Sequence, residues 1–454
     1  MKRQLGIWEA AALSVAIMAP TAAMALNGSL AASIAGTAVP LAFLGALITI
    51  ALVSYSFIEF SRRYAHAGSV YSFNGHGLGP RFGFLSGWAL LFTYTAFTGA
   101  SMAEIGAFFQ TFLDLLGVKI SWIVPAVIGG AILWYLSFRD VKLSTRVTMV
   151  IEGVSVLLIL ILAAIILGRG GAHGLSLQPF AVGKAGVSAV ALASVFAFLS
   201  FAGFEGAATL GEETVNPTRQ IPRAITMAVF LTGAFYLLIS YTQSEGFGLT
   251  AQGIKAFASS TAPLGTLAQG YVSTVMAAII MFGATISAFS SALGTATGGS
   301  RILFAMSRDG FGPKPWGESH PRHGTPYRAL AVVMIVAFAA NFILLGQLGT
   351  SVFGWLGTIG VLSLLLVYLA TQVAAMRLFA GRWKAWQYAI PAVAVVLLLY
   401  TLYSNIYPLP SAPFNYFPYV VLAWIVVGVI VAIASPAAAR RLGEHLAQDP
   451  EGDS

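Results

Sequence analysis

The chain lacks cysteine and is poor in charge. Asp, Glu, Lys and Arg make up only 9% of its 454 residues, whereas 58% are hydrophobic. Without cysteine it can form neither a disulfide nor a thiolate metal site, and no histidine falls in a long hydrophobic run. We therefore expect no metal site and no cofactor. Soluble domains are usually about a quarter charged, so this composition indicates an all-α polytopic membrane protein.

Hydrophobic runs long enough to cross a bilayer, about 18 residues or more, predict twelve transmembrane helices. Their approximate limits are 7–26, 40–60, 84–112, 120–138, 147–167, 188–212, 224–242, 268–304, 329–346, 353–378, 386–403 and 416–434. The third and eighth runs are too long for a perpendicular span, so we expect them to tilt or to extend beyond the membrane. Residues 1–3 are expected to be the mature start and not part of a cleaved signal.

The basic residues indicate the orientation. A cytoplasmic N-terminus places 20 of the 24 Lys and Arg residues inside and leaves only four outside: Lys119, Arg169, Lys184 and Lys255. Such an excess is the positive-inside pattern of cytoplasmic membrane proteins. It predicts a multi-pass protein of the cytoplasmic (inner) membrane with both termini in the cytoplasm. Topology thus accounts for the net charge of +8, and we expect the lipid bilayer and no nucleic acid as a partner.

Two spans contain features that membrane helices seldom tolerate. Pro20 lies within the first span, where it removes a backbone hydrogen bond, and the sixth span combines Glu205 with Gly203 and Gly206. Lipid cannot solvate an ionised carboxylate, so Glu205 must face a protein-enclosed or water-filled space. The alternatives are a plain proline kink and a structural pair for the carboxylate. Because the matched irregularities fall in two spans, broken helices are the better interpretation.

The two irregular spans lie five apart and therefore cross the membrane in opposite directions. This is the pattern of an inverted repeat with a solute site at the helix breaks. The predicted organisation is a first repeat over 1–167 (spans 1–5), a second repeat over 168–380 (spans 6–10), and a third part over 381–454 with spans 11 and 12 and a cytoplasmic tail.

Several motifs extend this interpretation to most of the chain. They are AGSVYSF at 67–73, GPRFGFLSGW at 79–88, GFE at 203–205, NPTRQIPRAI at 216–225 and SRILFAMSRDG at 300–310. Together they resemble motifs of the amino acid–polyamine–organocation (APC) superfamily, of the amino acid permease type. The resemblance implies a LeuT-type 5+5 inverted repeat, with broken helices 1 and 6 and two additional C-terminal helices.

The breaks themselves predict a substrate site. Unwinding a helix frees N–H groups that attract a carboxylate and C=O groups that attract an ammonium. The predicted substrate-binding residues surround both breaks, with Phe198 or Phe201 as an aromatic lid: Met18, Ala19, Pro20, Thr21, Ala22, Phe198, Phe201, Ala202, Gly203, Phe204 and Glu205. The first break departs from the glycine-rich, serine-containing pattern that the resemblance implies for amino acid carriers.

Buried carboxyl groups are candidates for proton coupling, because an apolar environment favours their protonated form. The candidates are Glu104, Glu152 and Glu205. By the resemblance, Ser155 takes the place of a lysine that substitutes for a sodium ion in many branches. The predicted coupling residues lie on spans 3, 5 and 8, although helix packing explains the serines equally well: Glu104, Glu152, Ser155, Ser287, Ser290 and Ser291.

The predicted function is a secondary active transporter that imports an amino acid with protons by alternating access. The alternatives are a transporter or exchanger of polyamines or another small organic amine, and sodium-coupled uptake. A channel would need a continuous polar stripe or a repeated filter sequence, and an enzyme a converging set of nucleophiles or metal ligands. Neither pattern occurs in the sequence.

Overall fold

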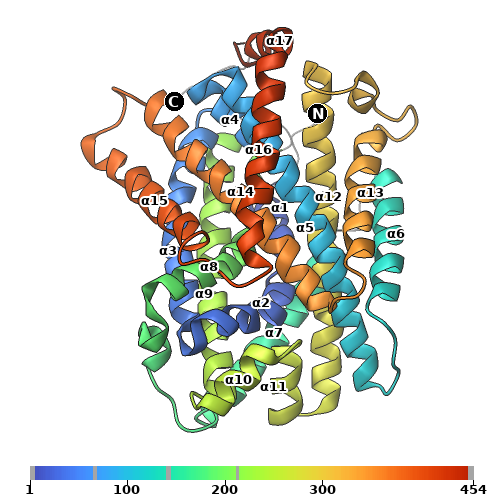
Figure 1. Ribbon diagram of the computed structural model, residues 1–454, viewed down its shortest axis with the longest axis vertical. Coiled ribbons are helices and arrows are strands. Elements are labelled where there is room, and N and C mark those ends of the chain that lie inside the picture. Colours follow the sequence, from blue (N-terminus) through green and yellow to red (C-terminus); the bar gives the residue numbers. More distant parts are fainter. Residues whose placement is uncertain (1–5, 65–68, 140–144, 211–213, 448–454) are drawn as a thin grey trace.

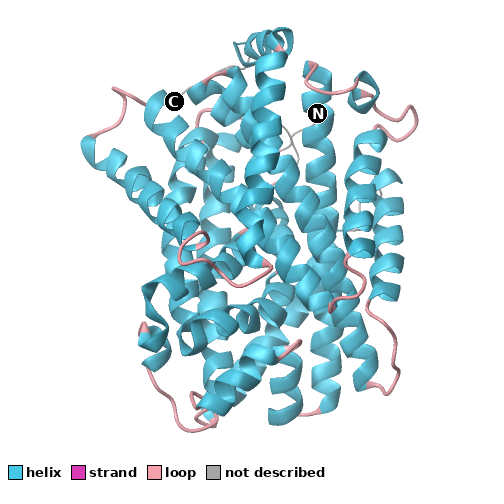
Figure 2. Ribbon diagram, viewed as in Figure 1, coloured by secondary structure: helices cyan, strands magenta, loops and turns pink. Residues whose placement is uncertain are grey.

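The computed structural model describes residues 6–64, 69–139, 145–210 and 214–447. Every regular element in these ranges is a helix (Figure 2). The long helices, with the two halves of the broken ones, are α1 (Ile7–Met18), α2 (Pro20–Ala35), α3 (Val39–Ser61), α5 (Pro80–Leu115), α6 (Ile123–Arg139), α7 (Thr145–Gly168), α8 (Gly186–Phe201), α9 (Pro217–Phe247), α12 (Thr274–Asp309), α13 (Tyr327–Ile343), α14 (Gly349–Leu378), α15 (Ala385–Ser404) and α16 (Phe417–Ala434).

Shorter helices connect these elements. The α-helical ones are α4 (Ser69–Leu78), α10 (Ala251–Ser259), α11 (Pro263–Tyr271) and α17 (Pro436–Ala447). The 3₁₀ turns are η1 (Gly36–Ala38), η2 (Gln178–Phe180), η3 (Gly183–Ala185), η4 (Phe204–Leu210), η5 (Lys314–Gly317) and η6 (Phe414–Tyr416).

Each of the twelve predicted runs coincides with one helix or with one broken helix, so the predicted fold class is confirmed. Eight stretches of the described residues are long and apolar enough to cross a membrane, and the first of them contains both α1–α2 and α3. The remaining spans are α5 and the shorter apolar helices α6 and α13. The expected long third and eighth helices are α5 and α12, with 36 residues each.

Several predicted limits were wrong; the seventh span, for example, begins at Pro217 and not at 224. The first span continues beyond residue 26 to Ala35, because α2 resumes after the break. The eighth span begins at Thr274 and not at 268, because the preceding apolar residues belong to α11. Ser273 starts the new helix, its side chain accepting a hydrogen bond from the Met276 N–H, which is the usual function of a serine N-cap.

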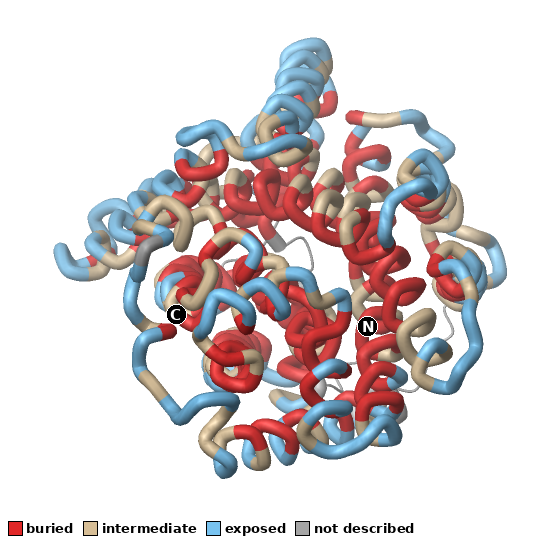
Figure 3. The backbone as a smooth tube through the Cα atoms, turned by 60° about the horizontal axis from the view of Figure 1, so that its bottom comes forward, coloured by how far each residue is buried: buried red, intermediate tan, exposed pale blue. Residues whose placement is uncertain are grey.

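Burial separates central helices from peripheral ones (Figure 3). In their most apolar windows, 72% of α14 and 61% of α12 are buried, compared with 22% of α15 and α16. The exposed side chains of the two peripheral helices are largely apolar; Val396 and Ile430, for example, are 65% and 60% exposed. Such a surface suits lipid, so the peripheral helices face the bilayer while the central helices surround the site.

The two ends of the molecule differ in their short helices. α4 and α17 lie at one end and α10 and α11 at the other (Figure 1). At the α4–α17 end, Asp309 accepts a hydrogen bond from the Tyr71 hydroxyl at 2.6 Å and lies 3.0 Å from His445 Nδ1. Burial, together with the Asp309 carboxylate, raises the pKa of Tyr71 above its ordinary value, which keeps the hydroxyl protonated as a donor. These contacts attach α17 to α4 and α12.

The two broken helices pack against each other in opposite directions. α1, the first half of span 1, contacts η4, the second half of span 6, while α2 contacts α8. This antiparallel pairing is what an inverted repeat produces when its first and sixth spans meet. It brings both breaks to the same depth in the centre of the bundle.

Candidate functional site

The first break lies between α1 and α2. Ala19 has the left-handed conformation (φ 45°, ψ 64°), and Pro20 follows as the first residue of α2. Proline at this position has no N–H to leave unsatisfied, and its fixed φ suits the first turn of a helix. A local change of direction at a non-glycine residue therefore separates the two half-helices.

The N–H groups that open α2 are bonded to side chains of other helices. The Thr21 N–H donates to Glu152 Oε1 at 2.9 Å, and the Ala22 N–H donates to Ser287 Oγ at 3.2 Å. Glu152 comes from α7 and Ser287 from α12. The first N–H groups of a helix lack intrahelical acceptors and favour negative charge. The position predicted for a substrate carboxylate thus holds the carboxyl group of Glu152.

The second break lies between α8 and η4. Ala202 is extended, and Gly203 has a φ of 104°, which L side chains rarely adopt. A Cβ on Gly203 would meet Ile17 of α1, so only glycine fits this close approach. Glu205 stabilises the break locally, because its Oε2 accepts a hydrogen bond from the Gly203 N–H at 3.2 Å.

Two tyrosines complete the surroundings of Glu205. The Tyr368 hydroxyl donates to Oε2 at 3.3 Å and the Tyr94 hydroxyl to Oε1 at 3.5 Å. The carboxyl group, which is 1% exposed, thereby joins η4 to α5 and α14. Glu205 is thus hydrogen-bonded inside the bundle and does not face the cavity described below.

Sequence reasoning missed two residues that connect the breaks. The Tyr236 hydroxyl lies 2.8 Å from Ser200 O and 3.3 Å from Met18 O, the carbonyl groups freed at the ends of α8 and α1. Ser14 donates to Phe204 O and accepts from the Ala207 N–H, both at 2.9 Å. The only sequence signal for these two residues was a hydroxyl group in an otherwise apolar span. This signal is weak, because many such hydroxyl groups bond a carbonyl group of their own helix.

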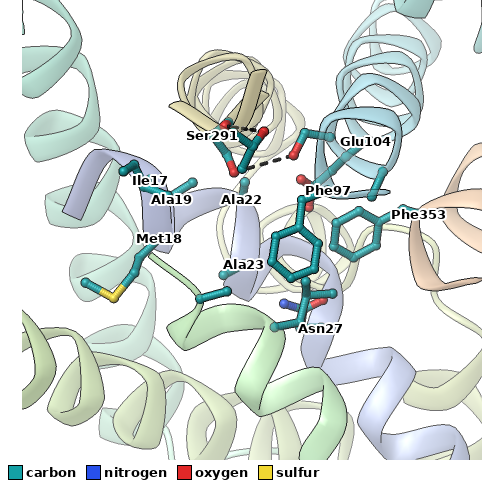
Figure 4. A pocket seen from close by; sticks show the side chains of 15 residues that line it. Ile17, Met18, Ala19, Ala22, Ala23, Asn27, Phe97, Glu104, Ser291 and Phe353 are labelled. Atoms are coloured by element: carbon teal, nitrogen blue, oxygen red, sulfur yellow. Dashed lines mark hydrogen bonds between the residues drawn. The ribbon is translucent and has the colours of Figure 1, made fainter. Parts of the chain in front are cut away.

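A small cavity lies against both breaks. Its volume of about 30 Å³ is enough for about one or two water molecules. Spans 1, 3, 6, 8 and 10 line it (Figure 4), through Ile17, Met18, Ala19, Ala22, Ala23, Asn27, Phe97, Ala100, Ser101, Glu104, Leu199, Ala202, Ser291, Thr295 and Phe353. Of the predicted site residues, those that line it are Met18, Ala19, Ala22, Ala202, Glu104 and Ser291.

The other predicted substrate residues lie around the breaks but not on the cavity. Phe198, proposed as a lid, is buried in the core, and Phe201 packs edge-on against Tyr236 with the ring centroids 5.1 Å apart. The cavity receives its aromatic rings from elsewhere, from Phe97 and Phe353. The predicted substrate residues that do not line the cavity are Pro20, Thr21, Phe198, Phe201, Gly203, Phe204 and Glu205.

The predicted coupling residues also separate into groups. Glu104 and Ser291 line the cavity, while Glu152 and Ser287 bind the N–H groups of α2. Two further serines bond carbonyl groups of their own helices: Ser155 bonds Ile151 O and Ser290 bonds Ile286 O. A Cβ on Gly283 of α12 would meet the Ser155 hydroxyl, so this serine packs between two helices. Sequence spacing could place these serines on a face but could not assign their hydrogen bonds.

Known proteins show the same architecture. A mutant of the manganese transporter of Eremococcus coleocola superposes with a TM-score of 0.57 over 97% of this chain and 98% of its own, at 12% sequence identity, which supports the fold alone. A bundle of about twelve helices, with two antiparallel broken helices beside a small cavity, has the LeuT-type fold.

Sequence comparison identifies the family. The amino acid permease model matches residues 11–437, so the chain belongs to the amino acid permease family. Similar proteins include the branched-chain amino acid permease BcaP of Bacillus subtilis strain 168, 28% identical over 72% of each chain. The methylthioribose transporter of the same organism is 27% identical over 95% of this chain and 93% of its own. The low-affinity putrescine importer PlaP of Escherichia coli K12 is 28% identical over 67% of each chain.

Proposed function

We propose that this protein imports a small solute with a basic amino group, an amino acid or a related amine, across the cytoplasmic membrane together with protons. The family supports a carrier of this class, and the relatives include a branched-chain amino acid permease and a putrescine importer. In this proposal the α4–α17 end faces the cytoplasm. The distribution of 20 of the 24 basic residues supports this orientation.

The small size of the site supports alternating access. A cavity of about 30 Å³ is smaller than any amino acid. In the proposed cycle the bundle opens at the breaks, first toward one end and then toward the other, to admit and release a solute. The antiparallel pairing of α1–α2 with α8–η4 supports rocking of these two broken helices against their surroundings.

The observation that carries the coupling proposal is the hydrogen bond from the Thr21 N–H to Glu152 Oε1. A hydrogen bond to a carboxylate is about twice as strong as one between neutral groups. Protonation of Glu152 removes the negative charge from the α2 N-terminus and weakens its attachment to α7. Proton binding thereby lets the start of α2 move relative to α7. Residues of this first break also form part of the cavity wall.

Uptake into proteoliposomes tests this function. An inward acid gradient without sodium should drive accumulation of a solute from a panel of radiolabelled amino acids and amines, and a protonophore should abolish it. Uptake that requires sodium and ignores pH would contradict proton coupling.

A pair of α7 variants tests the residue. Glu152→Gln keeps the side-chain volume and an acceptor oxygen but cannot carry a proton. It should lose concentrative uptake and retain exchange or downhill flux. Ser155→Ala, less than one turn away, removes a hydroxyl that bonds its own helix and should behave as wild type. Wild-type concentrative uptake in Glu152→Gln would rule out the coupling role. Poor expression and low thermal stability would instead indicate a purely structural carboxyl group.

A further inference from the structure

The cavity wall contains unusual acceptor atoms. Within the described residues, Glu104 Oε1 has no hydrogen-bond partner, although Glu104 is only 3% exposed. Asn27 Oδ1 also has no hydrogen-bond partner. The hydrogen bond of this side chain to Ser200 Oγ is donated by its amide nitrogen. Figure 4 shows Glu104 beside Ser291 and places Asn27 near the rings of Phe97 and Phe353. Buried polar atoms are nearly always bonded, so two unbonded acceptors on one small cavity call for a ligand that donates.

Positive charge is missing from the same wall. None of the 15 lining residues is Lys, Arg or His, and Glu104 is the one ionisable residue among them. A ligand carboxylate would therefore meet a carboxyl group and no cationic side chain. The apolar part of the wall includes two aromatic rings, whose faces attract cations.

Three backbone donors at the breaks that could bind a carboxylate are already bonded to protein groups. At the first break, the Thr21 N–H bonds Glu152 and the Ala22 N–H bonds Ser287. At the second break, the Gly203 N–H bonds the Glu205 carboxyl group. Carboxyl groups of the protein thus occupy both helix breaks, and a substrate carboxylate would have to displace one of them.

We infer that the transported solute is an amine without a carboxylate, whose ammonium group donates to Glu104 Oε1 and Asn27 Oδ1 between the rings of Phe97 and Phe353. This inference rests on the proposed function and selects one of its two substrate classes. Glu104 then acts as a substrate-binding residue, whereas the sequence alone indicated only a coupling role.

Matched ligand pairs test the substrate class. Putrescine and ornithine differ only in a carboxylate, as do isoamylamine and leucine. Ligand-induced thermal stabilisation of the purified full chain measures binding without any gradient. We expect each amine to bind about ten- to hundredfold more tightly than its amino acid, the size of one hydrogen bond to a charged group. Equal or tighter binding of the amino acids overturns the inference and leaves the proposed function intact. Binding and uptake of neither class overturns both.

Variants of the carboxyl group test its assignment. Glu104→Gln should weaken amine binding about ten- to hundredfold, because a neutral amide loses the charge that the ammonium requires. Glu104→Asp keeps the charge and should retain part of the affinity. Ser290→Ala, on α12 but off the cavity, should bind as wild type. Unchanged amine affinity in a folded, monodisperse Glu104→Gln protein overturns the assignment.

Discussion

The break at Ala19–Pro20 and the break at Ala202–Gly203 lie side by side, yet their exposed backbone groups are bonded to partners of different origin. At the first break, Thr21 depends on Glu152, 131 residues away in the sequence. At the second break, Gly203 uses the carboxyl group of Glu205, two residues further on. The N–H groups of the first break thus depend on helices α7 and α12, whereas the Gly203 N–H at the second break depends on a carboxyl group of its own segment.

This difference suggests different tasks. A break bonded to distant helices is sensitive to the position of those helices and to the charge of Glu152, which is what the proposed proton coupling requires. At the second break, the carboxyl group of Glu205 stays next to the Gly203 N–H by its position in the sequence and does not depend on α7 or α12. Tyr236 links the two by facing a freed carbonyl group at each.

The largest effect on stability should come from substituting a residue that forms the turn of a break. Gly203→Ala forces a side chain into a φ of 104° and against Ile17, and we expect it to cost about 1–3 kcal/mol from the backbone alone. The clash with Ile17 of α1 adds to this cost, and no loss of cavity volume contributes, since Gly203 does not line the cavity. Ala19→Gly relieves a left-handed alanine and should change stability by less than about 1 kcal/mol. The thermal stability of both variants can be measured in detergent. Equal losses of stability would show that neither break depends more than the other on its particular residue.

Loss of the shared contact should rank second. Tyr236→Phe leaves the Ser200 carbonyl group without its 2.8 Å donor and should destabilise the protein by about 1–3 kcal/mol. Tyr241→Phe is the matched control on the same helix, because its hydroxyl bonds Ser176 O in a partly buried position and its loss should cost less. Equal stability of Tyr236→Phe and wild type would mean that Tyr236 does not hold the breaks together.

Removal of the distant cap should have a smaller effect. Glu152→Ala deprives the Thr21 N–H of its acceptor and should cost about 0.5–2 kcal/mol, the range for helix N-caps. Denaturation monitored by intrinsic fluorescence would measure this loss, with Ser287→Ala as the companion variant at Ala22. If neither variant loses stability, the α2 N–H groups do not depend on α7 and α12.

The smallest effect is expected for the serines that bond their own helices. Ser155→Ala and Ser290→Ala remove hydroxyls that bond Ile151 O and Ile286 O, and each should change stability by less than about 0.5 kcal/mol. Concentrative uptake should also persist in both variants. Loss of uptake in either would restore the coupling role that its position in the sequence suggested.

Much of the architecture could be predicted from local sequence patterns. Hydrophobic runs indicate spans because lipid requires about 20 apolar residues per helix, and Pro20 and Gly203 mark the breaks because each disturbs a helix by its own covalent structure. The distribution of basic residues indicates the orientation for a similarly simple physical reason. These features depend on neighbours along the chain and therefore need no knowledge of tertiary contacts.

The assignment of partners required the folded chain. Glu104, Glu152 and Glu205 look alike in the sequence as buried carboxylates, but one lines the cavity, one caps α2 and one caps its own break. Likewise, the aromatic rings of the cavity come from α5 and α14 and not from the sixth span. Contacts between helices depend on how each is rotated and tilted in the bundle, and packing between residues far apart in the chain determines that rotation.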